Sequence, residues 1–317
     1  MENGLFGVSA VTFENLRSIT SSCTNEFEER VCELAMLADA VASGVSALSS
    51  EGMSLYDAMT ALTEELDLFA DSEKTESYAL TDRYCKAFRG SIRDLDKLVF
   101  SELLCEKLKD RGYSVTERNF LVSEDCESLI AYVRSTLTDE AYDVFSQELD
   151  DPRILYVGNT REALRSVADG ECGYCIVPFE EKGGARVLGV FSAIASFDLK
   201  IVGVTPVFGP EGTADVKYAL VSRGFRELSR TEDDDFYLEL LISSDSRMSL
   251  GGLLSTAESF GYSAYNIGSV EYELDGERIS AVSVALRDGG RDFSAFLMLL
   301  TAFADDYTAI GFYKNIE

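Results

Sequence analysis

Phe236-Tyr-Leu-Glu-Leu-Leu-Ile242 is a short, mostly apolar run of the kind that forms a buried β-strand. Helix and strand patterns alternate after it. We predict a strand at Phe236–Ile242, a helix at Ser249–Phe260, strands at Ala264–Tyr272 and Ile279–Leu286, a helix at Phe293–Phe303 and a strand at Tyr307–Tyr313. The Asp275-Gly276 dipeptide between the middle strands suits a hairpin turn. The order βαββαβ predicts a ferredoxin-like, split βαβ fold for residues 229–317.

Residues 113–228 alternate strand patterns with helix patterns. The strands are predicted at Ile154–Val157, Gly173–Pro178, Leu199–Thr205 and Ala214–Ser222. Asn159 is a residue type that caps helices, and the helix after it is predicted to run to Ala168. Short strands that alternate with helices form α/β layers, so this region is predicted to be a single α/β lobe.

Residues 1–112 carry helical patterns without strand patterns. Apolar residues recur at helical spacing from Phe13 to about Leu108, with a break at Ser49–Gly52. Further helices are predicted at Leu55–Phe69 and Tyr78–Lys107. Three helices without strands predict a helical bundle. The fold class of the whole chain is therefore multidomain, α followed by α/β followed by α+β.

The charge of the chain excludes several classes of partner. The 317 residues include 28 Lys and Arg against 56 Asp and Glu, a formal net charge of −28. A field of this sign repels nucleic acids and anionic lipid surfaces, so neither nucleic acid nor a membrane is predicted as a partner. The longest apolar stretch, near Ala295 to Phe303, is about half of the roughly 20 residues that a membrane helix needs.

The absence of histidine from the sequence narrows the chemistry further. It removes histidine-based catalytic triads and histidine-ligated metals, and no metal or cofactor is predicted. The first cation is Arg17, so the N-terminus lacks the basic region of a signal peptide. Seven cysteines, an odd number, suit a reducing compartment better than a disulfide framework. The chain is therefore predicted to be cytoplasmic.

Three local patterns resemble known families, and they occur in one order. Gly173-Tyr-Cys-Ile-Val-Pro-Phe-Glu180, followed by Leu199-Lys-Ile-Val-Gly203, resembles a strand end and the "LKIVGE" motif of prephenate dehydratase. Residues 229–317 resemble an ACT domain. The residues that carry this second resemblance are Gly251-Gly-Leu-Leu254, Phe260, Asn266-Ile267, Val270-Glu271 and Ile310-Gly-Phe-Tyr313.

The leading bundle is similar to the helical chorismate mutase domain through Glu29-Arg30, Glu33-Leu34-Ala35 and Tyr56-Asp57. Mutase, dehydratase and ACT is the order of the bifunctional chorismate mutase–prephenate dehydratase of phenylalanine synthesis. The resemblance implies Arg17 and Arg30 as mutase candidates and Glu180 and Lys217 as dehydratase candidates.

The sequence also departs from this family where catalysis needs particular residues. No basic residue lies between Val31 and Glu73, although the mutase substrate is a dianion. The second dehydratase lobe is missing, and the family's catalytic threonine falls on Val216, which has no proton to donate. Lys217 stands in place of the family arginine. A catalytically defective, truncated relative is therefore predicted. The alternatives are an active, divergent enzyme of the phenylalanine pathway and a structural partner of such an enzyme.

The ACT resemblance implies a ligand. In the family, an amino acid binds at the seam between two ACT domains, so a homodimer is predicted, with a small amino acid such as phenylalanine at its seam. The residues implied to bind this ligand are Gly251, Gly252, Leu253, Leu254, Asn266 and Glu271. Glycines allow close approach of the ligand, and helix N-terminal amides favour a carboxylate. Glu273 replaces the family's cation, which predicts altered specificity.

Four further motifs each have a functional and a structural interpretation. Cys172-Gly-Tyr-Cys175 resembles a redox motif, but its second cysteine enters a buried strand, which favours a structural role. Lys182-Gly-Gly-Ala-Arg186 is either an anion-binding loop or a plain turn. Gly209-Pro-Glu-Gly-Thr213 matches the opening "GPEGT" loop of the dehydratase family but stands late in the chain, so it is interpreted as a turn between strands rather than a transplanted site. Asp233-Asp-Asp235 is interpreted as a solvated linker, because spaced oxygen ligands for calcium are missing.

Overall fold

The structure of the 317-residue chain is a computed structural model. It describes residues 10–50, 52–61, 94–181, 183–208, 214–226, 235–244, 249–274, 276–289, 291–303 and 307–316. The chain divides into two compact units. Unit 1 comprises Met1–Met53 and Glu64–Ser114, and unit 2 comprises Ser54–Thr63 and Val115–Glu317.

Unit 1 is built on two described helices, α1 (Ala10–Ser50) and α4 (Asp94–Asp110). The buried apolar residues of α1 recur at helical spacing and form one face. They are Leu34, Ala38, Val41, Ala42 and Val45, and those of α4 are Phe100, Leu104 and Leu108. Arg111 Nη2 lies 3.0 Å from Asp39 Oδ1, which ties the end of α4 to the middle of α1. The two helices pack through these faces.

The rest of the predicted bundle falls into two parts. One part belongs to unit 2, and the other lies outside the described residues. Residues 55–61 are helical but belong to unit 2, where Leu55, Ala58 and Met59 are buried. Most of the two helices predicted at Leu55–Phe69 and Tyr78–Lys107 falls in residues 62–93, outside the described residues.

One described segment of α1 has the composition of a membrane-crossing helix. Arg30–Ser50 is 21 residues long and apolar enough to cross a membrane by length and composition alone. Glu33 and Asp39 interrupt its apolar residues, so this segment does not contain the longest uninterrupted apolar stretch of the sequence. The same composition arises in helices of a protein core, and one face of this segment is buried against α4, although its most apolar window is only 28% buried.

The α/β lobe of unit 2 contains five strands and three helices among the described residues. The strands are β1 (Leu129–Tyr132), β2 (Arg153–Tyr156), β3 (Tyr174–Glu181), β4 (Lys200–Phe208) and β5 (Ala214–Ser222). The helices are α5 (Thr136–Phe145), α6 (Thr160–Ala168) and α7 (Leu188–Ser196). Strands β2, β1 and β3 are parallel, whereas β5 lies antiparallel between β3 and β4. Asn159 caps α6 through a hydrogen bond from the Glu162 amide, as its sequence position predicts.

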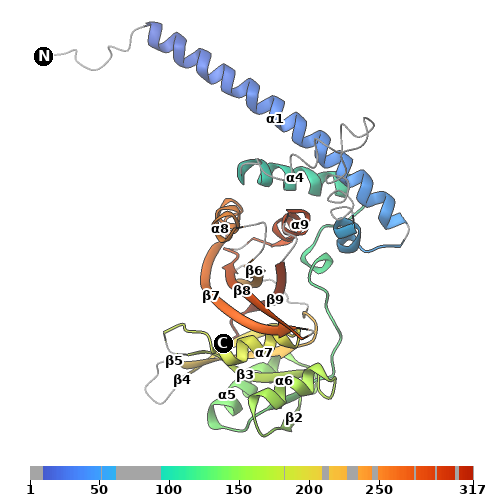
Figure 1. The fold of residues 1–317 in the computed structure, drawn as a ribbon, viewed down its shortest axis with the longest axis vertical. Coiled ribbons are helices and arrows are strands. Elements are labelled where there is room, and N and C mark those ends of the chain that lie inside the picture. Colours follow the sequence, from blue (N-terminus) through green and yellow to red (C-terminus); the bar gives the residue numbers. More distant parts are fainter. Residues whose placement is uncertain are drawn as a thin grey trace, which may run out of the picture. The chain divides into compact units, whose positions relative to one another are not determined.

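The C-terminal part of unit 2 has the predicted order βαββαβ. Its elements are β6 (Phe236–Ser243), α8 (Leu250–Ser259), β7 (Ser263–Leu274), β8 (Glu277–Arg287), α9 (Ser294–Phe303) and β9 (Tyr307–Lys314). The strands lie in the order β9-β6-β8-β7 and are all antiparallel to their neighbours. This is the strand order of the ferredoxin-like fold. Figure 1 shows α8 and α9 together on one side of these strands and α7 on the other.

The lobe and the C-terminal part share one nine-stranded sheet, in the order β2-β1-β3-β5-β4-β9-β6-β8-β7. They join where β4 pairs with β9, at Ile201 and Gly311, and the Ile316 amide donates to the Val204 carbonyl at 2.8 Å. A Cβ atom on Gly311 would lie 3.2 Å from the Ile201 Cβ, so glycine permits this close crossing. The boundary predicted between residues 228 and 229 therefore separates two segments of sequence that complete one sheet.

A common core also joins the two parts. Val190, Phe191 and Ile194 of α7 belong to the same buried cluster as Val270 of β7 and Ala281 of β8. Residues alternate between the two faces of a strand, so Phe236, Leu238 and Leu240 face one way while Tyr237 and Leu241 face the other. Tyr237 and Leu241 lie in the cluster shared with α7. Glu239 shares their face, and this places a carboxylate against the lobe.

Candidate functional site

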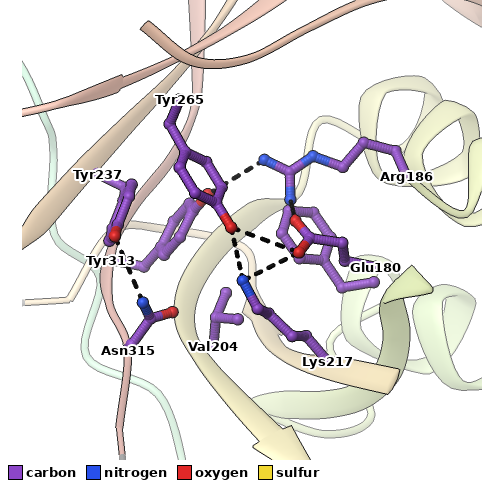
Figure 2. A pocket seen from close by; sticks show the side chains of 9 residues that line it. Glu180, Arg186, Val204, Lys217, Tyr237, Tyr265, Tyr313 and Asn315 are labelled. Carbon is purple, nitrogen blue, oxygen red and sulfur yellow. Dashed lines mark hydrogen bonds and ion pairs between the residues drawn. The ribbon is translucent and has the colours of Figure 1, made fainter. Parts of the chain in front are cut away.

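A small pocket lies where the α/β lobe meets the C-terminal part (Figure 2). The space between its lining atoms is about 160 Å³, and this figure includes open solvent. Its lining residues lie in β3, β4, β5, β6, β7 and β9 and in the segments that follow β3 and β9: Phe179, Glu180, Arg186, Val204, Lys217, Tyr237, Tyr265, Tyr313 and Asn315. Four of these nine side chains are aromatic and three are charged, so the pocket combines an apolar wall with a polar base.

Arg186 is held in place by the loop that follows β3. Gly183 and Gly184 both adopt positive φ angles, which glycine allows without strain, and the Glu181 amide donates to the Ala185 carbonyl at 2.8 Å. Asn266 of β7 fixes the loop from the other side, because its Nδ2 donates to the Gly184 carbonyl at 3.0 Å. This tight turn directs Arg186 towards β6 and β9.

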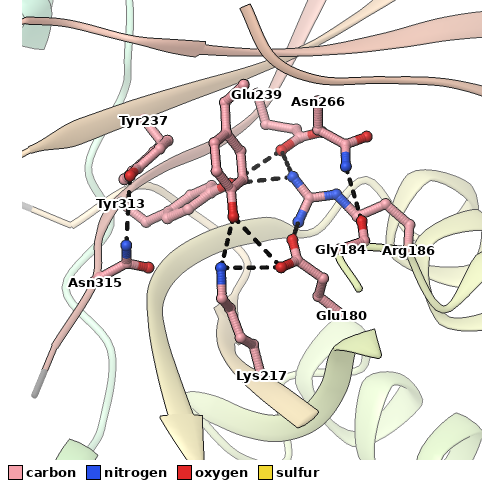
Figure 3. A network of polar contacts seen from close by, with 10 residues as sticks. Glu180, Gly184, Arg186, Lys217, Tyr237, Glu239, Asn266, Tyr313 and Asn315 are labelled. Carbon is pink, nitrogen blue, oxygen red and sulfur yellow. Dashed lines mark hydrogen bonds and ion pairs between the residues drawn. The ribbon is translucent and has the colours of Figure 1, made fainter. Parts of the chain in front are cut away.

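The Arg186 guanidinium binds two carboxylates, one from each part of unit 2 (Figure 3). Its Nη1 lies 3.0 Å from Glu180 Oε2, and its Nη2 lies 2.8 Å from Glu239 Oε2. Tyr313 completes the contact by donating its hydroxyl hydrogen to Glu239 Oε2 at 3.1 Å. The guanidinium carbon also lies 4.0 Å from the centre of the Phe179 ring, a cation–π geometry. All three charged side chains are at least nine-tenths buried.

Lys217 binds the second oxygen of Glu180. Its Nζ lies 2.9 Å from Glu180 Oε1 and donates to the Tyr265 hydroxyl at 2.6 Å. The pairing of β3 with β5 sets Glu180 opposite Lys217, so the strand register alone brings them together. The Lys217 side chain is 23% exposed, which makes it the charged group at the mouth of the pocket. The network as a whole carries two acids and two bases and is neutral.

Burial and pairing act in opposite directions on these groups. Burial alone would lower the pKa of Arg186, but Glu239, Tyr313 and Glu180 outweigh it, so this pKa is raised. Burial would likewise lower the pKa of Lys217, and its hydrogen bonds to Tyr265 and Glu180 raise it instead. Burial raises the pKa of Glu239, although Arg186 and Tyr313 oppose this. Both bases are therefore charged at neutral pH, and the ionised form of Glu239 is the costly member of the network.

Glu239 should make the stability of unit 2 depend on pH. Its raised pKa means that the folded protein holds this proton more tightly than the unfolded chain does. The resulting stability is fully present below about pH 4.3, the usual glutamate pKa, and is lost as the pH rises through the folded pKa. We therefore expect the unfolding free energy of the wild type, minus that of Glu239→Gln, to fall as the pH increases from that point. Urea denaturation at a series of pH values measures it. A difference that grows with pH would mean that pairing with Arg186 outweighs burial.

Three tyrosines form the wall of the pocket. The Tyr237 and Tyr313 rings stack with centres 5.5 Å apart, and the Tyr265 ring meets Tyr237 edge-on at 5.0 Å. Asn315 Nδ2 donates to the Tyr237 hydroxyl at 3.5 Å. These contacts hold the three rings against one another.

Of the candidate catalytic residues, the structure brings Glu180 and Lys217 together. Arg17 and Arg30 lie in α1 of unit 1, and the Arg17 side chain lies outside the described residues. Arg30 Nη1 lies 2.8 Å from Glu33 Oε2, one turn along its own helix. Val216, the residue in the position of the family threonine, pairs with Glu181 and Val207 in the sheet.

The residues that the ACT resemblance implies for ligand binding have separate surroundings. Gly251 and Gly252 lie in the first turn of α8, where the Gly252 amide already donates to the Ser249 side chain at 3.1 Å. Leu253 is fully buried and Leu254 is partly buried. Asn266 holds the loop that carries Arg186, and Glu271 is exposed and ion-paired with Arg278. Gly251 is the member of this set with open space, because no described atom lies within 4 Å of a Cβ built on it.

The remaining motifs take structural roles where they are described. Cys172 and Cys175 are buried free thiols; burial raises the pKa of Cys172 to about 11 and that of Cys175 well above its usual value. The described residues contain no group of three metal-binding side chains. Asp235 is ion-paired with Arg287. Lys182, residues 209–213 and Asp233-Asp234 lie outside the described residues.

Sequence reasoning missed Glu239, Tyr265 and Tyr313 as members of the site, and placed Arg186 in a loop that was either an anion-binding loop or a plain turn. Its guanidinium instead binds carboxylates of the chain itself. One signal was available. Glu239 is the one charged residue in Phe236–Ser243, whose first seven residues are all buried. A carboxylate in such a strand needs a buried cation nearby.

No family model matches the sequence, and no curated protein does. Among solved structures, the chain is similar to a prephenate dehydratase from Streptococcus mutans, with 18% identity, coverage of 60% of this chain and 99% of that one, and a TM-score of 0.47. A prephenate dehydratase from Arthrobacter aurescens, in complex with L-Phe, gives 14% identity, coverage of 58% and 89%, and a TM-score of 0.42. GqqA, described as a novel type of quorum quenching acylase, has 17% identity to this chain and a TM-score of 0.41. The match covers 59% of this chain and 95% of GqqA.

Proposed function

We propose that this chain is a catalytically defective relative of prephenate dehydratase that acts as a binding protein for a small amino acid. The observation that carries the first half of the proposal is the closed charge network at the adjoining ends of β3 and β5. Arg186 binds Glu180 and Glu239, and Lys217 binds Glu180, so both cations are already neutralised within the chain.

A dehydratase substrate would need these cations. Prephenate carries two carboxylates, and anionic substrates are bound through free Arg or Lys side chains. To reach Arg186, a substrate would have to displace two tethered and buried carboxylates. The space is also small, because the roughly 160 Å³ between the lining side chains includes open solvent and leaves almost no enclosed room for a substrate.

Two further features support a loss of catalysis. Val216 occupies the position where the family resemblance places a threonine, and its side chain has no proton for a departing hydroxide. Strands β4 and β5 are separated only by residues 209–213, so no second lobe is inserted between them. A cleft between two lobes is the place where the family resemblance puts the active site.

Purified protein mixed with prephenate should form phenylpyruvate no faster than prephenate does alone. The absorbance of phenylpyruvate in alkali measures the product, and Lys217→Ala provides the matched comparison. Equal rates for the wild type, Lys217→Ala and buffer are expected. Formation above the buffer rate that disappears in Lys217→Ala would show a working dehydratase site and contradict the proposal.

The second half of the proposal concerns the C-terminal part. The βαββαβ order and the Gly251-Gly252 pair support an ACT-like role, in which a ligand carboxylate would approach the first turn of α8. On one side of this part, β9 already pairs with β4, whereas β7 is the outer strand of the described sheet. An outer strand leaves backbone groups without strand partners, so we propose that two copies pair through β7 and hold the amino acid at their seam.

Ligand binding to the folded state must raise its thermal midpoint by mass action. We expect at least one of the common amino acids, phenylalanine included, to raise the midpoint of the wild type at millimolar concentration. Gly251→Val should abolish the shift, because Gly251 faces open space and the change fills it without touching the fold. Light scattering should give the mass of a dimer. A monomer, or a midpoint unmoved by the whole set of amino acids, would refute this half of the proposal.

A further inference from the structure

We propose that Arg186 and Tyr313 form a carboxylate-binding site that the chain fills with its own Glu239 (Figure 3). The guanidinium comes from the loop after β3, whereas the carboxylate and the hydroxyl come from β6 and β9. Arg186 Nη2 lies 2.8 Å from Glu239 Oε2, and the Tyr313 hydroxyl lies 3.1 Å from the same oxygen. A guanidinium and a hydroxyl that converge on one carboxylate oxygen are a common means of recognising an acid.

The Glu239 backbone belongs to β6, but its side chain binds a cation of the lobe. Its neighbours Leu238 and Leu240 are buried and apolar, and Glu239 itself is 0% exposed. An unpaired carboxylate at such a depth is strongly unfavourable, so its location depends on the cation that the lobe supplies. The lobe in turn brings both Arg186 and Lys217 to this point but only one acid, Glu180. Without Glu239, the lobe would present an excess positive charge.

The tethered carboxylate fills the site incompletely. One hydrogen bond, from Arg186 Nη2 to Glu239 Oε2, connects the two side chains. The adjacent Arg186 Nε and the second oxygen, Glu239 Oε1, are buried and have no hydrogen-bond partner among the described residues. An arginine edge formed by Nε and one Nη can bind both oxygens of a carboxylate in parallel. Glu239 does not adopt that geometry, whereas a free carboxylate, which is not tethered to β6, could adopt it.

Arg186 borders the pocket, which is the side from which a carboxylate would have to reach it. Arg186 lines the pocket together with Lys217 and Tyr265, whose side chains are partly exposed at its mouth. The pocket leaves almost no free room beside Arg186, so a ligand would have to be a short monocarboxylate, or the carboxylate end of a larger molecule, that takes the place of the Glu239 carboxylate. In the wild type, any such ligand has to compete with Glu239 at an effectively high local concentration. Glu239 therefore occupies the site in the wild type and competes with any external carboxylate.

Truncation of the internal carboxylate should open the site to an external one. Glu239→Ala leaves room beside Arg186, whereas Glu239→Gln is neutral but keeps the space filled. We expect sodium formate, compared with sodium chloride at equal ionic strength, to raise the thermal midpoint of Glu239→Ala by about 2–4 °C for a severalfold excess over its dissociation constant. Formate should leave the wild type and Glu239→Gln unmoved. Acetate should act similarly on Glu239→Ala.

The other possible results of the formate experiment either support the proposed site or overturn it. An equal rise in all three proteins would be a general effect of the salt and would overturn the site. No rise in a folded Glu239→Ala would overturn it as well. Should Glu239→Ala be unfolded in chloride, recovery of its folded far-ultraviolet circular dichroism in formate supports the site. Failure in both salts, with Glu239→Gln folded, overturns it.

Discussion

Replacement of Arg186 with methionine should lower the free energy of unfolding of unit 2 by about 3–5 kcal/mol. The change removes the cation that Glu180 and Glu239 share, and both carboxylates are at least nine-tenths buried. A buried carboxylate without its partner either stays charged at a high cost or takes up a proton. Urea denaturation followed by circular dichroism measures the loss.

Two variants make this experiment specific. Arg278→Met breaks an exposed ion pair with Glu271 and should cost less than about 1 kcal/mol. The double variant Arg186→Met, Glu239→Leu should recover much of the loss, because apolar replacements for a buried ion pair are often tolerated. If Arg186→Met alone stays within about 1 kcal/mol of the wild type, the network is not a buried ion pair in solution.

Gly173→Ala should prevent the folding of the α/β lobe. A Cβ atom built on Gly173 lies 2.0 Å from the Glu127 carbonyl oxygen and 2.9 Å from Cys126 Cβ. Backbone cannot yield as a flexible side chain does, so the approach of the segment before β1 to the segment before β3 has to widen. Single changes of this kind belong to the rare group that costs more than about 4 kcal/mol. We expect the variant to be recovered as insoluble or unfolded protein.

Gly189→Ala is the matched control. Gly189 lies in α7, and no described atom approaches within 4 Å of its built Cβ. Alanine there should stabilise the helix by about 0.5–1 kcal/mol. The thermal midpoints of the two variants should therefore lie on opposite sides of the wild type. A soluble Gly173→Ala protein with a midpoint near that of the wild type would show that β1 and β3 do not approach as described.

The C-terminal part was predictable because its signals are local. Each strand there is a buried or alternating run of at least eight residues, and Ser249 marks the start of α8 as a capping residue. Strand β1 was missed because its four residues, Leu129–Tyr132, are too few to show a period. Helix α7 was missed because its sequence, Leu-Gly-Val-Phe-Ser-Ala-Ile-Ala-Ser, is apolar on most sides, and burial by β7 and β8 holds it in place.

The candidate site was predictable only at the two positions that the family resemblance covers. Glu180 and Lys217 were named from that resemblance, and the pairing of β3 with β5 sets them opposite each other in the structure. The contact between Arg186 and Tyr313 joins residues 127 positions apart, through a sheet that forms only when β4 meets β9. Neither residue lies in a motif with a spacing that could reveal the other. Such contacts follow from tertiary packing, which a single sequence does not display.

The central place of β9 in the sheet has a consequence for biosynthesis. Residues 307–314 are the last described strand in the sequence, yet they lie between β4 and β6, with five strands on one side and three on the other. Ribosomes deliver the two halves of the sheet before the strand that unites them. Until it arrives, β4 and β6 each carry an open edge, and open edges are where unfinished chains associate. Synthesis of this protein thus passes through a vulnerable interval that ends only with the insertion of β9, and chaperones that shield strand edges should matter most during that interval.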